Sequence, residues 1–422
     1  MLVVVSLRIA ITGRGAISPI GLSNGELCDA LLSGRIGIRQ APWAADAGND
    51  QELFAAVDDR FDPADWLDAK VIEGCDPFAW FALAAAEQAI TEAGLLGALD
   101  PVRTAVVHGT SMGGLHALMR AQWALERGGP SSVPNKTMIQ IWPNMAAAQL
   151  CMRHRLHGPS LTVTTACASS LDALGTAARF LNAGLADVAI VGGTEGGFPA
   201  GQYASPGFVP ATAAATGGYG MSSGSVDPTR AMLPFDANRS GIVSGEGSAF
   251  FVIETEAHAT RRGANVLAWL DGYASLADGH HPSAPEPSGK WESRVMELAL
   301  ADADCAPSEV DCLIAHATGT PKGDAAEIRA INTTFDRRDL VVTGLKGHTG
   351  HTGASAGAMN ILATVEAMQN GRLVNVAGTT TVDPDVAFDV VLREPRSVDV
   401  EVAQINAFGF GGQNASVVLR RP

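Results

Sequence analysis

A single cysteine stands among small residues at the end of an apolar stretch. Residues 162–170 read TVTTACASS, so Cys167 follows a strand-like run and precedes the helical pattern SSLDALGTAARFLNAG. At a strand-to-helix turn the sulfur lies near the helix N-terminus, whose positive dipole end lowers a thiol pKa and favours the nucleophilic thiolate. Small neighbours would leave that sulfur accessible. Taken alone, the motif fits a tight packing site equally well, because free cysteine is usually a buried hydrophobe.

Two further segments carry histidines at predicted strand ends. Residues 313–327 read LIAHATGTPKGDAAE, which places His316 after an apolar strand and before a loop. Residues 343–357 read TGLKGHTGHTGASAG and gather Lys346, His348 and His351 in a glycine-rich turn, where backbone and imidazole can approach a ligand closely. A cysteine with two such histidines is typical of nucleophilic catalysis. A zinc site is the weaker interpretation, because no ligand spacing supports it.

Two glycine-punctuated turns remain. The stretch NAFGFGGQN at 406–414 follows a predicted strand but has no following lysine and no helix opening at its glycines, so it is a poor nucleotide cradle. The stretch HGTSMGG at 108–114 fails the same test. Backbone N–H groups freed at such turns can instead hold an oxyanion.

Short apolar runs alternate with Ala/Leu-rich helical stretches and supply the elements that would position these residues. Continuous apolar strands between helices indicate an α/β fold with sheets covered on both faces. The predicted strands are 8–13, 104–110, 160–166, 186–193, 249–255, 310–320, 340–344, 402–408 and 415–421, and the predicted helices are 24–34, 77–94, 144–154 and 324–334. Two long loops, 199–232 and 278–289, are of a length that often lines an active site.

One pattern occurs twice. Residues 166–184 and 351–371 both read as a small-residue turn, an amphipathic helix and a helix-ending glycine. Each copy carries a reactive residue type at the start of its helix. Two similar halves in one chain is the economical interpretation, and accident is the alternative.

Composition excludes several classes of protein. The chain has 422 residues, 46% hydrophobic and 17% charged, and a formal net charge of −15, which predicts a globular protein without nucleic acid as a partner. The six cysteines show no disulfide-like spacing, so most are expected to be buried small hydrophobes. The apolar start is interpreted as a first strand and not as a signal peptide. With no run of about 18 apolar residues, a soluble cytoplasmic protein without membrane contact is expected.

The motifs together resemble a known family. TACASS with Cys167, AHATGTPKGDAAE with His316, LKGHTGHTGASAG with Lys346 and His351, and NAFGFGGQN occur in the order and spacing of the elongating β-ketoacyl-acyl carrier protein synthases, the 3-oxoacyl-ACP synthase II-like ketosynthases of the thiolase superfamily. LPFDANRSGIVSGEG at 233–247 is similar to another family segment. The resemblance covers essentially the whole chain.

The resemblance implies a fold and a reaction. The expected fold is thiolase-like: two duplicated halves, each with a mixed five-stranded sheet, form a five-layer αβαβα sandwich that dimerises through a central strand. The halves would be residues 1–260, carrying the nucleophile, and residues 261–422, carrying the histidines and lysine. The expected reaction is a decarboxylative Claisen condensation: an acyl group moves onto Cys167, and a malonyl thioester then loses CO₂ and attacks it.

The resemblance also implies roles for individual residues. Cys167 is the nucleophile, and the N–H groups of Cys167 and Phe410 form the oxyanion hole, each donor worth about 3 kcal/mol in such sites. His316 and His351 donate to the malonyl thioester oxygen, and His316 can also activate a water. Lys346 orders this cluster, with Glu327 as its expected partner, because an unpaired buried ammonium is costly.

The remaining implied residues bind substrate. Thr318, Thr320 and Ser283 would hold the pantetheine arm of the carrier protein, which brings its own phosphopantetheine, so no separate cofactor and no metal are expected. Phe410, with Phe408 beside it, would separate the acyl and malonyl chambers. Met112 in TSMGG would line the acyl-tail pocket, where a flexible thioether suits varied chains.

The chain departs from the family pattern where the carrier protein is expected to dock. Family members usually present a basic patch before the third helix, but AKVIEGCDPF offers Lys70 beside Glu73, and GFVPATAAATGG lacks the expected arginine. Arg120, Arg127 and Lys136 are candidates to compensate, as is a partner subunit. This departure favours a type II polyketide or polyene pathway over housekeeping fatty acid elongation, with either a homodimer or a heterodimer with a chain-length factor.

Three related classes fit less well. A degradative thiolase would carry a second catalytic cysteine near the C-terminus, where this chain has NAFGFGG. An initiating synthase would pair the cysteine with one histidine and one asparagine. A non-catalytic chain-length-factor-like subunit would lose the cysteine, whereas Cys167, both histidines and Lys346 are all present.

Overall fold

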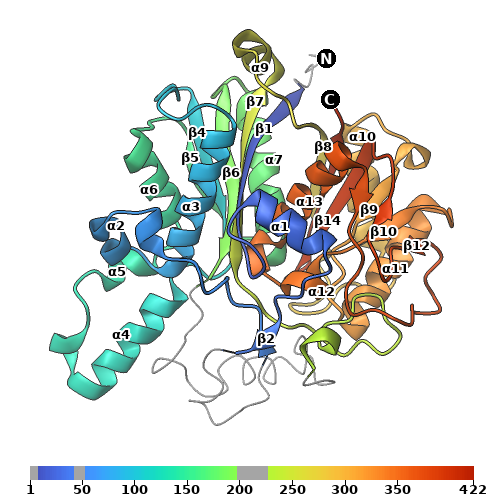
Figure 1. Ribbon diagram of the computed structural model, residues 1–422, viewed down its shortest axis with the longest axis horizontal. Helices are drawn as coiled ribbons and strands as arrows, with labels where there is room; N and C mark the ends of the chain where they lie inside the picture. Colours follow the sequence, from blue (N-terminus) through green and yellow to red (C-terminus); the bar gives the residue numbers. More distant parts are fainter. Residues whose placement is uncertain (1–7, 42–52, 197–226) are drawn as a thin grey trace.

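A mixed β-sheet runs through the molecule and carries strands from both halves of the chain (Figure 1). The computed structural model describes residues 8–41, 53–196 and 227–422. Within them the strand order is β12-β10-β9-β14-β15-β8-β1-β7-β6-β4-β5. The bounds are β1 Ile9–Ile17, β4 Thr104–Gly109, β5 Ser160–Val163, β6 Val188–Glu195, β7 Gly247–Thr255, β8 Ala268–Ala277, β9 Cys312–Ile314, β10 Val341–Thr343, β12 Asp389–Val390, β14 Val402–Gly409 and β15 Gln413–Arg420. Two small ribbons pair β2 (Arg39–Gln40) with β3 (Leu53–Phe54) and β11 (Arg372–Leu373) with β13 (Arg396–Ser397).

The two sides of this sheet repeat one pairing pattern. In β1-β7-β6-β4-β5 the successive pairs are antiparallel, antiparallel, parallel and parallel. The series β8-β15-β14-β9-β10 has the same succession, with the two-residue β12 added at its edge. A short antiparallel register, Ile9↔Leu270 to Ile11↔Ala268, joins the two series. The duplication expected from the sequence is therefore present in the strand order, while the division at residue 260 stays a prediction.

Helices cover the strands in layers, which Figure 1 shows from left to right. Three clusters of buried apolar side chains separate five layers: one under α3 and α6, one around the central α7 and α13, and one under α10 and α11. The predicted five-layer α/β sandwich is confirmed. The helices are α1 Asn24–Leu32, α2 Ala69–Gly74, α3 Pro77–Glu92, α4 Leu115–Gly128, α5 Thr137–Ile141, α6 Met145–His154, α7 Ser169–Asn182, α9 Glu256–Arg262, α10 Lys290–Asp302, α11 Pro321–Phe335, α12 Lys346–Thr349 and α13 Ala356–Asn370.

Local chemistry explains where the helix nearest the site begins. Helix α11 starts with Pro321, whose fixed φ and missing N–H suit a first helical position. Its N-cap is Thr320, whose hydroxyl accepts a hydrogen bond from the N–H of Gly323 at 3.1 Å. These bonds hold the loop between β9 and α11 in one conformation.

The two repeated helices pack against each other at the centre of the molecule. Each follows a short 3₁₀ turn, Ala166–Ala168 before α7 and Gly353–Ser355 before α13. The N–H of Ala358 donates to the hydroxyl of Ser170 at 3.0 Å. Gly357 lies so close to Leu171 that an added Cβ would be 2.8 Å from its side chain. The repeat seen in the sequence thus brings the two helix N-termini together.

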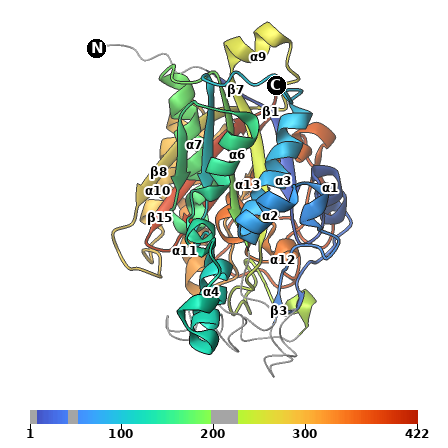
Figure 2. The same ribbon diagram turned by 90° about the vertical axis from the view of Figure 1, so that its left-hand side faces the viewer.

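Several boundaries differ from the sequence predictions. The predicted strands 160–166 and 310–320 contain only β5 and β9, because the chain turns toward the site as soon as the ladder ends. Helices α4 and α10 and strand β8 were not predicted, since their apolar residues are interspersed with charges. Figures 1 and 2 show α4 projecting from one end of the molecule. Residues 199–226 of the first predicted loop lie outside the described residues. Among the helices described, none has the length and apolarity to span a bilayer.

Candidate active site

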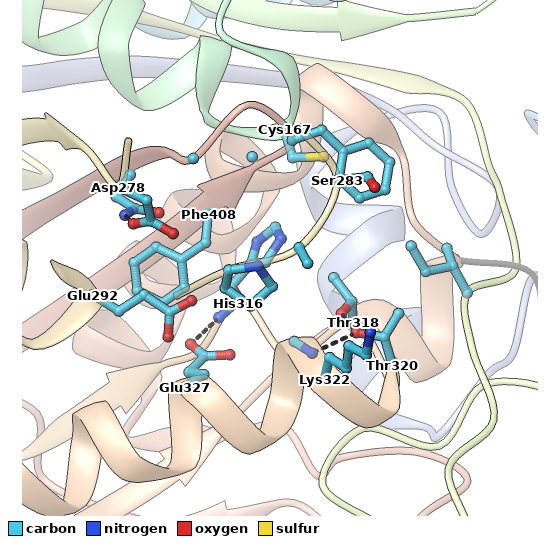
Figure 3. A pocket seen from close by; sticks show the side chains of 18 of the residues that line it. Cys167, Asp278, Ser283, Glu292, His316, Thr318, Thr320, Lys322, Glu327 and Phe408 are labelled. Atoms are coloured by element: carbon cyan, nitrogen blue, oxygen red, sulfur yellow. Dashed lines mark hydrogen bonds between the residues drawn. The ribbon is translucent and has the colours of Figure 1, made fainter. Parts of the chain in front are cut away.

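A cavity of about 200 Å³ lies where the chain leaves β9, β14 and the turn before α7 (Figure 3). The predicted catalytic residues that line it are Cys167, His316, His351 and Glu327. The predicted substrate-binding residues that line it are Ser283, Thr318, Thr320, Phe408 and Phe410. The second predicted loop contributes Asp278, Ser283 and Pro285, so the expectation that this loop lines the site is confirmed.

The turn that presents Cys167 has an unusual backbone. Ala166, the residue before it, has φ of 50°, a left-handed conformation that costs a non-glycine residue of order 1–3 kcal/mol. The turn is held by the hydroxyl of Ser169, which accepts from the N–H of Thr165 at 2.9 Å and donates to the Ala166 carbonyl. Gly409 lies against it, where an added Cβ would be 2.7 Å from the Thr165 carbonyl oxygen. The glycine therefore allows the second strand turn to approach the sulfur.

The Cys167 thiol is partly exposed, as expected, but its charge state differs from the expectation. Burial raises the pKa of the thiol to about 11. The Lys346 ammonium and the N–H groups of Phe410 and Cys167 itself act in the opposite direction, and the Glu195 carboxylate adds to the rise. The prediction of a lowered thiol pKa is wrong, because loss of solvent outweighs the positive helix end. A base must take the proton when this sulfur attacks.

His351 is placed to act as that base. Its Nε2 lies 3.0 Å from the Cys167 sulfur. Its backbone is fixed by the Val243 carbonyl, which accepts from the His351 N–H at 2.7 Å, and by the Gly245 N–H, which donates to the His351 carbonyl at 2.9 Å. Burial and the nearby Lys346 hold the pKa of His351 well below its usual value. The imidazole is therefore neutral and can either accept or donate a proton.

His316 is the second imidazole of the site and is tied to Lys346. The two histidine rings meet edge to face, with centroids 5.6 Å apart. The Lys346 ammonium donates to the His316 carbonyl and lies 3.3 Å from its Nδ1. A donor at Nδ1 leaves the ring proton on Nε2. Burial, Lys346 and His351 lower the pKa of His316 well below its usual value, so His316 is a neutral hydrogen-bond donor.

Glu327 supports the backbone at His316 and does not touch Lys346. Its two carboxylate oxygens accept from the N–H groups of His316 at 2.7 Å and Ala317 at 2.6 Å, as Figure 3 shows. Ala317 has φ of 42°, so this contact fixes a second left-handed residue. Among the described residues Lys346 and Glu327 form no ion pair within 4.0 Å. The expected direct partnership is replaced by one through the His316 backbone.

His348, singled out with the other histidines, lies outside the cavity. Its Nδ1 is 2.9 Å from the Arg35 carbonyl and its Nε2 is 2.8 Å from the Asn375 carbonyl. These contacts tie the turn of α12 to two other loops. Its role is structural.

The threonines lie at one side of His316, beside Lys322 (Figure 3). The hydroxyls of Thr318 and Thr320 are 3.0 Å apart. The Asp324 carboxylate accepts from the Gly319 N–H at 2.9 Å. This fixed polar wall offers hydroxyl groups to an extended substrate arm.

Two predicted residues are open to solvent in the single chain. Phe410 is 47% exposed and reaches the cavity, while Met112 is 49% exposed and does not line it. Phe408 lies deeper, with its ring 5.8 Å from the His316 ring. The structure therefore gathers every predicted site residue at the cavity except Met112 and Lys346, which acts behind His316.

The sequence did not point to four residues of the cavity wall: Asp278, Glu292, Lys322 and Asn414. Asp278 and Asn414 bond one another, and Asp278 also accepts from the Glu286 N–H at 2.9 Å. Glu292 is buried in α10, a helix that the sequence did not predict. Lys322 was visible within the threonine motif, but nothing in a single sequence shows its direction.

The cluster could also be considered as a metal site. The Cys167 sulfur and one nitrogen from each of His316 and His351 lie within 4.8 Å of one another. That spacing is compatible with a thiophilic cation. The Lys346 ammonium in contact with His316 opposes a second positive charge there. A thiol, two neutral imidazoles and converging N–H groups are better suited to acyl transfer through an oxyanion.

Comparison with known protein families matches both halves of the chain. The model described as "Beta-ketoacyl synthase, N-terminal domain" matches residues 6–259, and "Beta-ketoacyl synthase, C-terminal domain" matches residues 267–380. Among curated proteins, 3-oxoacyl-[acyl-carrier-protein] synthase 2 of Synechocystis is 34% identical over 418 residues, and that of Coxiella burnetii is 32% identical over 421 residues. Each alignment covers 98% of this chain and 98% of the relative.

Solved structures give the same result. A beta-ketoacyl synthase from Burkholderia phymatum is 31% identical, with a TM-score of 0.88, over 99% of this chain and 100% of the other. The ishigamide ketosynthase/chain length factor has a TM-score of 0.89 at 28% identity, with the same coverage. A type II polyketide ketosynthase in complex with its acyl-carrier protein and bound to a hexaketide has a TM-score of 0.88 at 25% identity, again over 99% and 100%.

Proposed function

The chain belongs to the β-ketoacyl synthase family and is an acyl-transferring enzyme of fatty acid or polyketide synthesis, and from that premise we propose that Cys167 carries the acyl chain during condensation. The observation that carries this proposal is the 3.0 Å contact between the Cys167 sulfur and His351 Nε2, with His316 beside them. It supplies a nucleophile, its base and a second donor in one cavity.

The first step is transfer of the acyl group from a carrier-protein thioester. The Cys167 sulfur attacks the thioester carbonyl, and its proton passes to His351 and then to the departing carrier thiol. The N–H groups of Cys167 and Phe410, which both act on the sulfur electrostatically, would hold the oxyanion. The product is an acyl-Cys167 thioester and a free carrier thiol.

The second step is condensation with a malonyl thioester. Its carboxylate leaves as CO₂, and the electrons of the broken C–C bond form an enolate whose oxygen accepts from His316 and His351. The enolate carbon attacks acyl-Cys167, and the released thiolate takes up one proton. Lys346 keeps His316 in the donor tautomer through its contact with Nδ1.

The other predicted residues have supporting roles in this scheme. Glu327 fixes the His316 backbone. Thr318, Thr320 and Ser283 would bind the pantetheine arm that the carrier protein brings, so the reaction requires no separate cofactor.

The two phenylalanines and Met112 would shape the path of the acyl chain. Phe410 would gate the cavity, with Phe408 as its inner wall. Met112 would contact the acyl tail once a second subunit covers it, because it is half exposed in the single chain.

The carrier-protein surface supports a dedicated pathway. Lys136 is paired with Glu73 at 3.0 Å, and the Arg127 guanidinium stacks on Trp123 at 4.2 Å. Arg120 donates to Gln140 at 2.7 Å. These candidate basic residues are already engaged, and the chain carries a net charge of −15. An acidic carrier would find little attraction here, which favours a polyketide or polyene pathway with its own carrier over housekeeping elongation.

A dimer follows from the edge of the sheet. Strand β5 is an edge strand with exposed side chains, and such an edge is open to pairing with another chain. Exposed apolar side chains surround it: Leu118, Leu125, Met138, Ile139, Trp142, Met152 and Leu161. The partner would be a second copy or a related chain-length factor. Leu161→Arg should convert the assembly to monomers in sedimentation experiments. A cytoplasmic location stays a prediction from the sequence.

The test is to incubate the protein with saturated and polyunsaturated acyl carrier proteins and to weigh the intact protein. We expect an acyl adduct that Cys167→Ala abolishes and that malonyl carrier protein then consumes with chain extension. Cys151→Ala is the matched control, because Cys151 is also partly exposed but lies outside the cavity. Transfer from saturated donors with a fatty acid carrier alone would contradict the dedicated pathway, and absence of any adduct would contradict the catalytic role.

A further inference from the structure

Glu292 is a buried acid without a partner at the wall of the active-site cavity. It lies in the first turn of α10, is 2% exposed, and lines the same cavity as Cys167 and His316. It forms no hydrogen bond or ion pair with any described residue, and its Oε2 is closed off from solvent. A glutamate in a first helical turn commonly bonds a free backbone N–H, but this side chain turns inward instead.

Its surroundings make this carboxyl neutral. Burial raises the pKa of Glu292 well above the usual value, and the carboxyl groups of Glu327, Asp278, Asp324 and Glu286 add to the rise. These acids come from α11, the end of β8 and the loop that follows it. The uncharged His316 also faces this region (Figure 3). Glu292 therefore presents an O–H group to the cavity.

The other polar groups of the cavity are already engaged. The Thr318 and Thr320 hydroxyls bond each other, and the Asn414 amide donates to Asp278. The Lys346 ammonium is held by His316. In the view of Figure 3, Glu292 and Phe408 lie on one side of His316 and the threonines with Lys322 on the other. An extender unit whose thioester arm follows the threonines and whose carbonyl meets His316 would direct its free end toward Glu292.

We propose that Glu292 is a positioning residue whose O–H donates a hydrogen bond to the carboxylate of the extender unit before it leaves as CO₂. The inference rests on the proposed function, since it needs a malonyl-type thioester in this cavity. An O–H to carboxylate hydrogen bond is short and strong because the acceptor is charged. CO₂ is uncharged and a weak acceptor, so the contact is lost when the C–C bond breaks. Glu292 itself gains and loses no proton.

A contact made in the ground state and lost afterwards affects binding more than turnover. Glu292→Leu should raise the KM for malonyl carrier protein by about ten-fold or more, with kcat changed little. Glu292→Gln should stay within about three-fold, because its amide still donates. Glu297→Gln is the matched control, since Glu297 lies exposed on the same helix, paired with Arg294 at 2.9 Å, and should change nothing.

The pH dependence gives a second readout that does not depend on Glu292→Leu folding. As pH rises through the raised pKa of Glu292, the carboxylate formed would repel the extender carboxylate. The malonyl KM of the unchanged enzyme should therefore rise at alkaline pH, and that rise should be absent in Glu292→Gln. A rise that persists in Glu292→Gln would overturn the proposal.

Acylation of Cys167 separates this inference from the proposed function. Intact-mass measurement of the acyl adduct needs no extender, so it should be unchanged in both Glu292 variants. Equal losses of acylation and condensation would assign Glu292 to packing, and an unchanged malonyl KM in Glu292→Leu would leave it no role in binding. An unchanged enzyme that forms no adduct would instead contradict the proposed function.

Discussion

Two turns of the same design present the two partners of the active site. The turn before α7 carries Cys167, and the turn before α13 follows His351. In the first, Ala166 adopts φ of 50°; in the second, Gly350 and Gly353 adopt 63° and 56°. The same left-handed bend is thus a strained alanine in one copy and glycine in the other. The duplication supplied the bend, and the residues placed on it divided into nucleophile and base.

Glu195 explains part of the difference. It lies at the end of β6 and accepts from the N–H groups of Ser111 and Met112 at 3.1 Å and of Ala354 at 3.3 Å. An added Cβ on Gly353 would be 2.9 Å from its side chain. The second turn therefore has no room for the alanine that the first one tolerates. Strain is kept where it orients the sulfur.

The largest expected effect comes from removing the reactive atom of the first turn. Cys167→Ala should lower condensation by about four orders of magnitude, because the acyl group has no acceptor. Release of CO₂ from malonyl carrier protein should persist, since His316 and His351 remain in place. Chain extension and CO₂ release measured in parallel decide the point, and loss of both together would mean that the two turns do not act separately.

The histidines should separate the two steps. His351→Ala should lower acylation of Cys167 by about 10²–10⁴-fold, because its Nε2 is the group that contacts the sulfur. His316→Ala should leave acylation within about ten-fold and lower CO₂ release by a similar 10²–10⁴-fold. Single-turnover mass measurements report the first step and CO₂ release the second. Equal losses in both steps for both variants would remove the distinction.

The charge state of Cys167 is measurable as a pH profile. Because burial raises the thiol pKa to about 11, the thiolate fraction should increase about ten-fold per pH unit from pH 7 to 9. The rate of alkylation by iodoacetamide should follow it over about two orders of magnitude. A free cysteine in a short peptide, with an ordinary pKa near 8.5, is the control and should level off earlier. A plateau below pH 8 in the enzyme would restore the stabilised thiolate expected from the helix dipole.

The smallest effect concerns the bend itself. Gly353→Ala should lower the free energy of unfolding by about 1–3 kcal/mol, through its positive φ and its contact with Glu195. Ala166→Gly should change it by less than about 1 kcal/mol, because relief of strain is offset by the larger backbone entropy of glycine. Urea unfolding of both variants gives the comparison. Equal values would mean that the two turns are conformationally equivalent.

Local patterns in the sequence were sufficient for much of this molecule. Alternating apolar runs and helical stretches predicted the layered α/β fold, and the repeated turn and helix at 166–184 and 351–371 predicted the duplication. Cys167, His316 and His351 were recognisable because each sits beside glycines or small residues at a strand end. These signals survive in a single sequence because they depend on neighbours along the chain.

Only the tertiary structure decided how these residues are charged and paired. Cys167 lies about 150 residues or more before His316, Lys346 and His351, and its raised pKa reflects how much solvent their approach removes. Glu327 was matched to Lys346 by residue type, but the fold gave its carboxylate to the His316 and Ala317 N–H groups. Glu292 was invisible because burial without a partner is a property of three-dimensional packing. Chemistry and local conformation are encoded nearby in the sequence, whereas electrostatics is set by what the folded chain brings together.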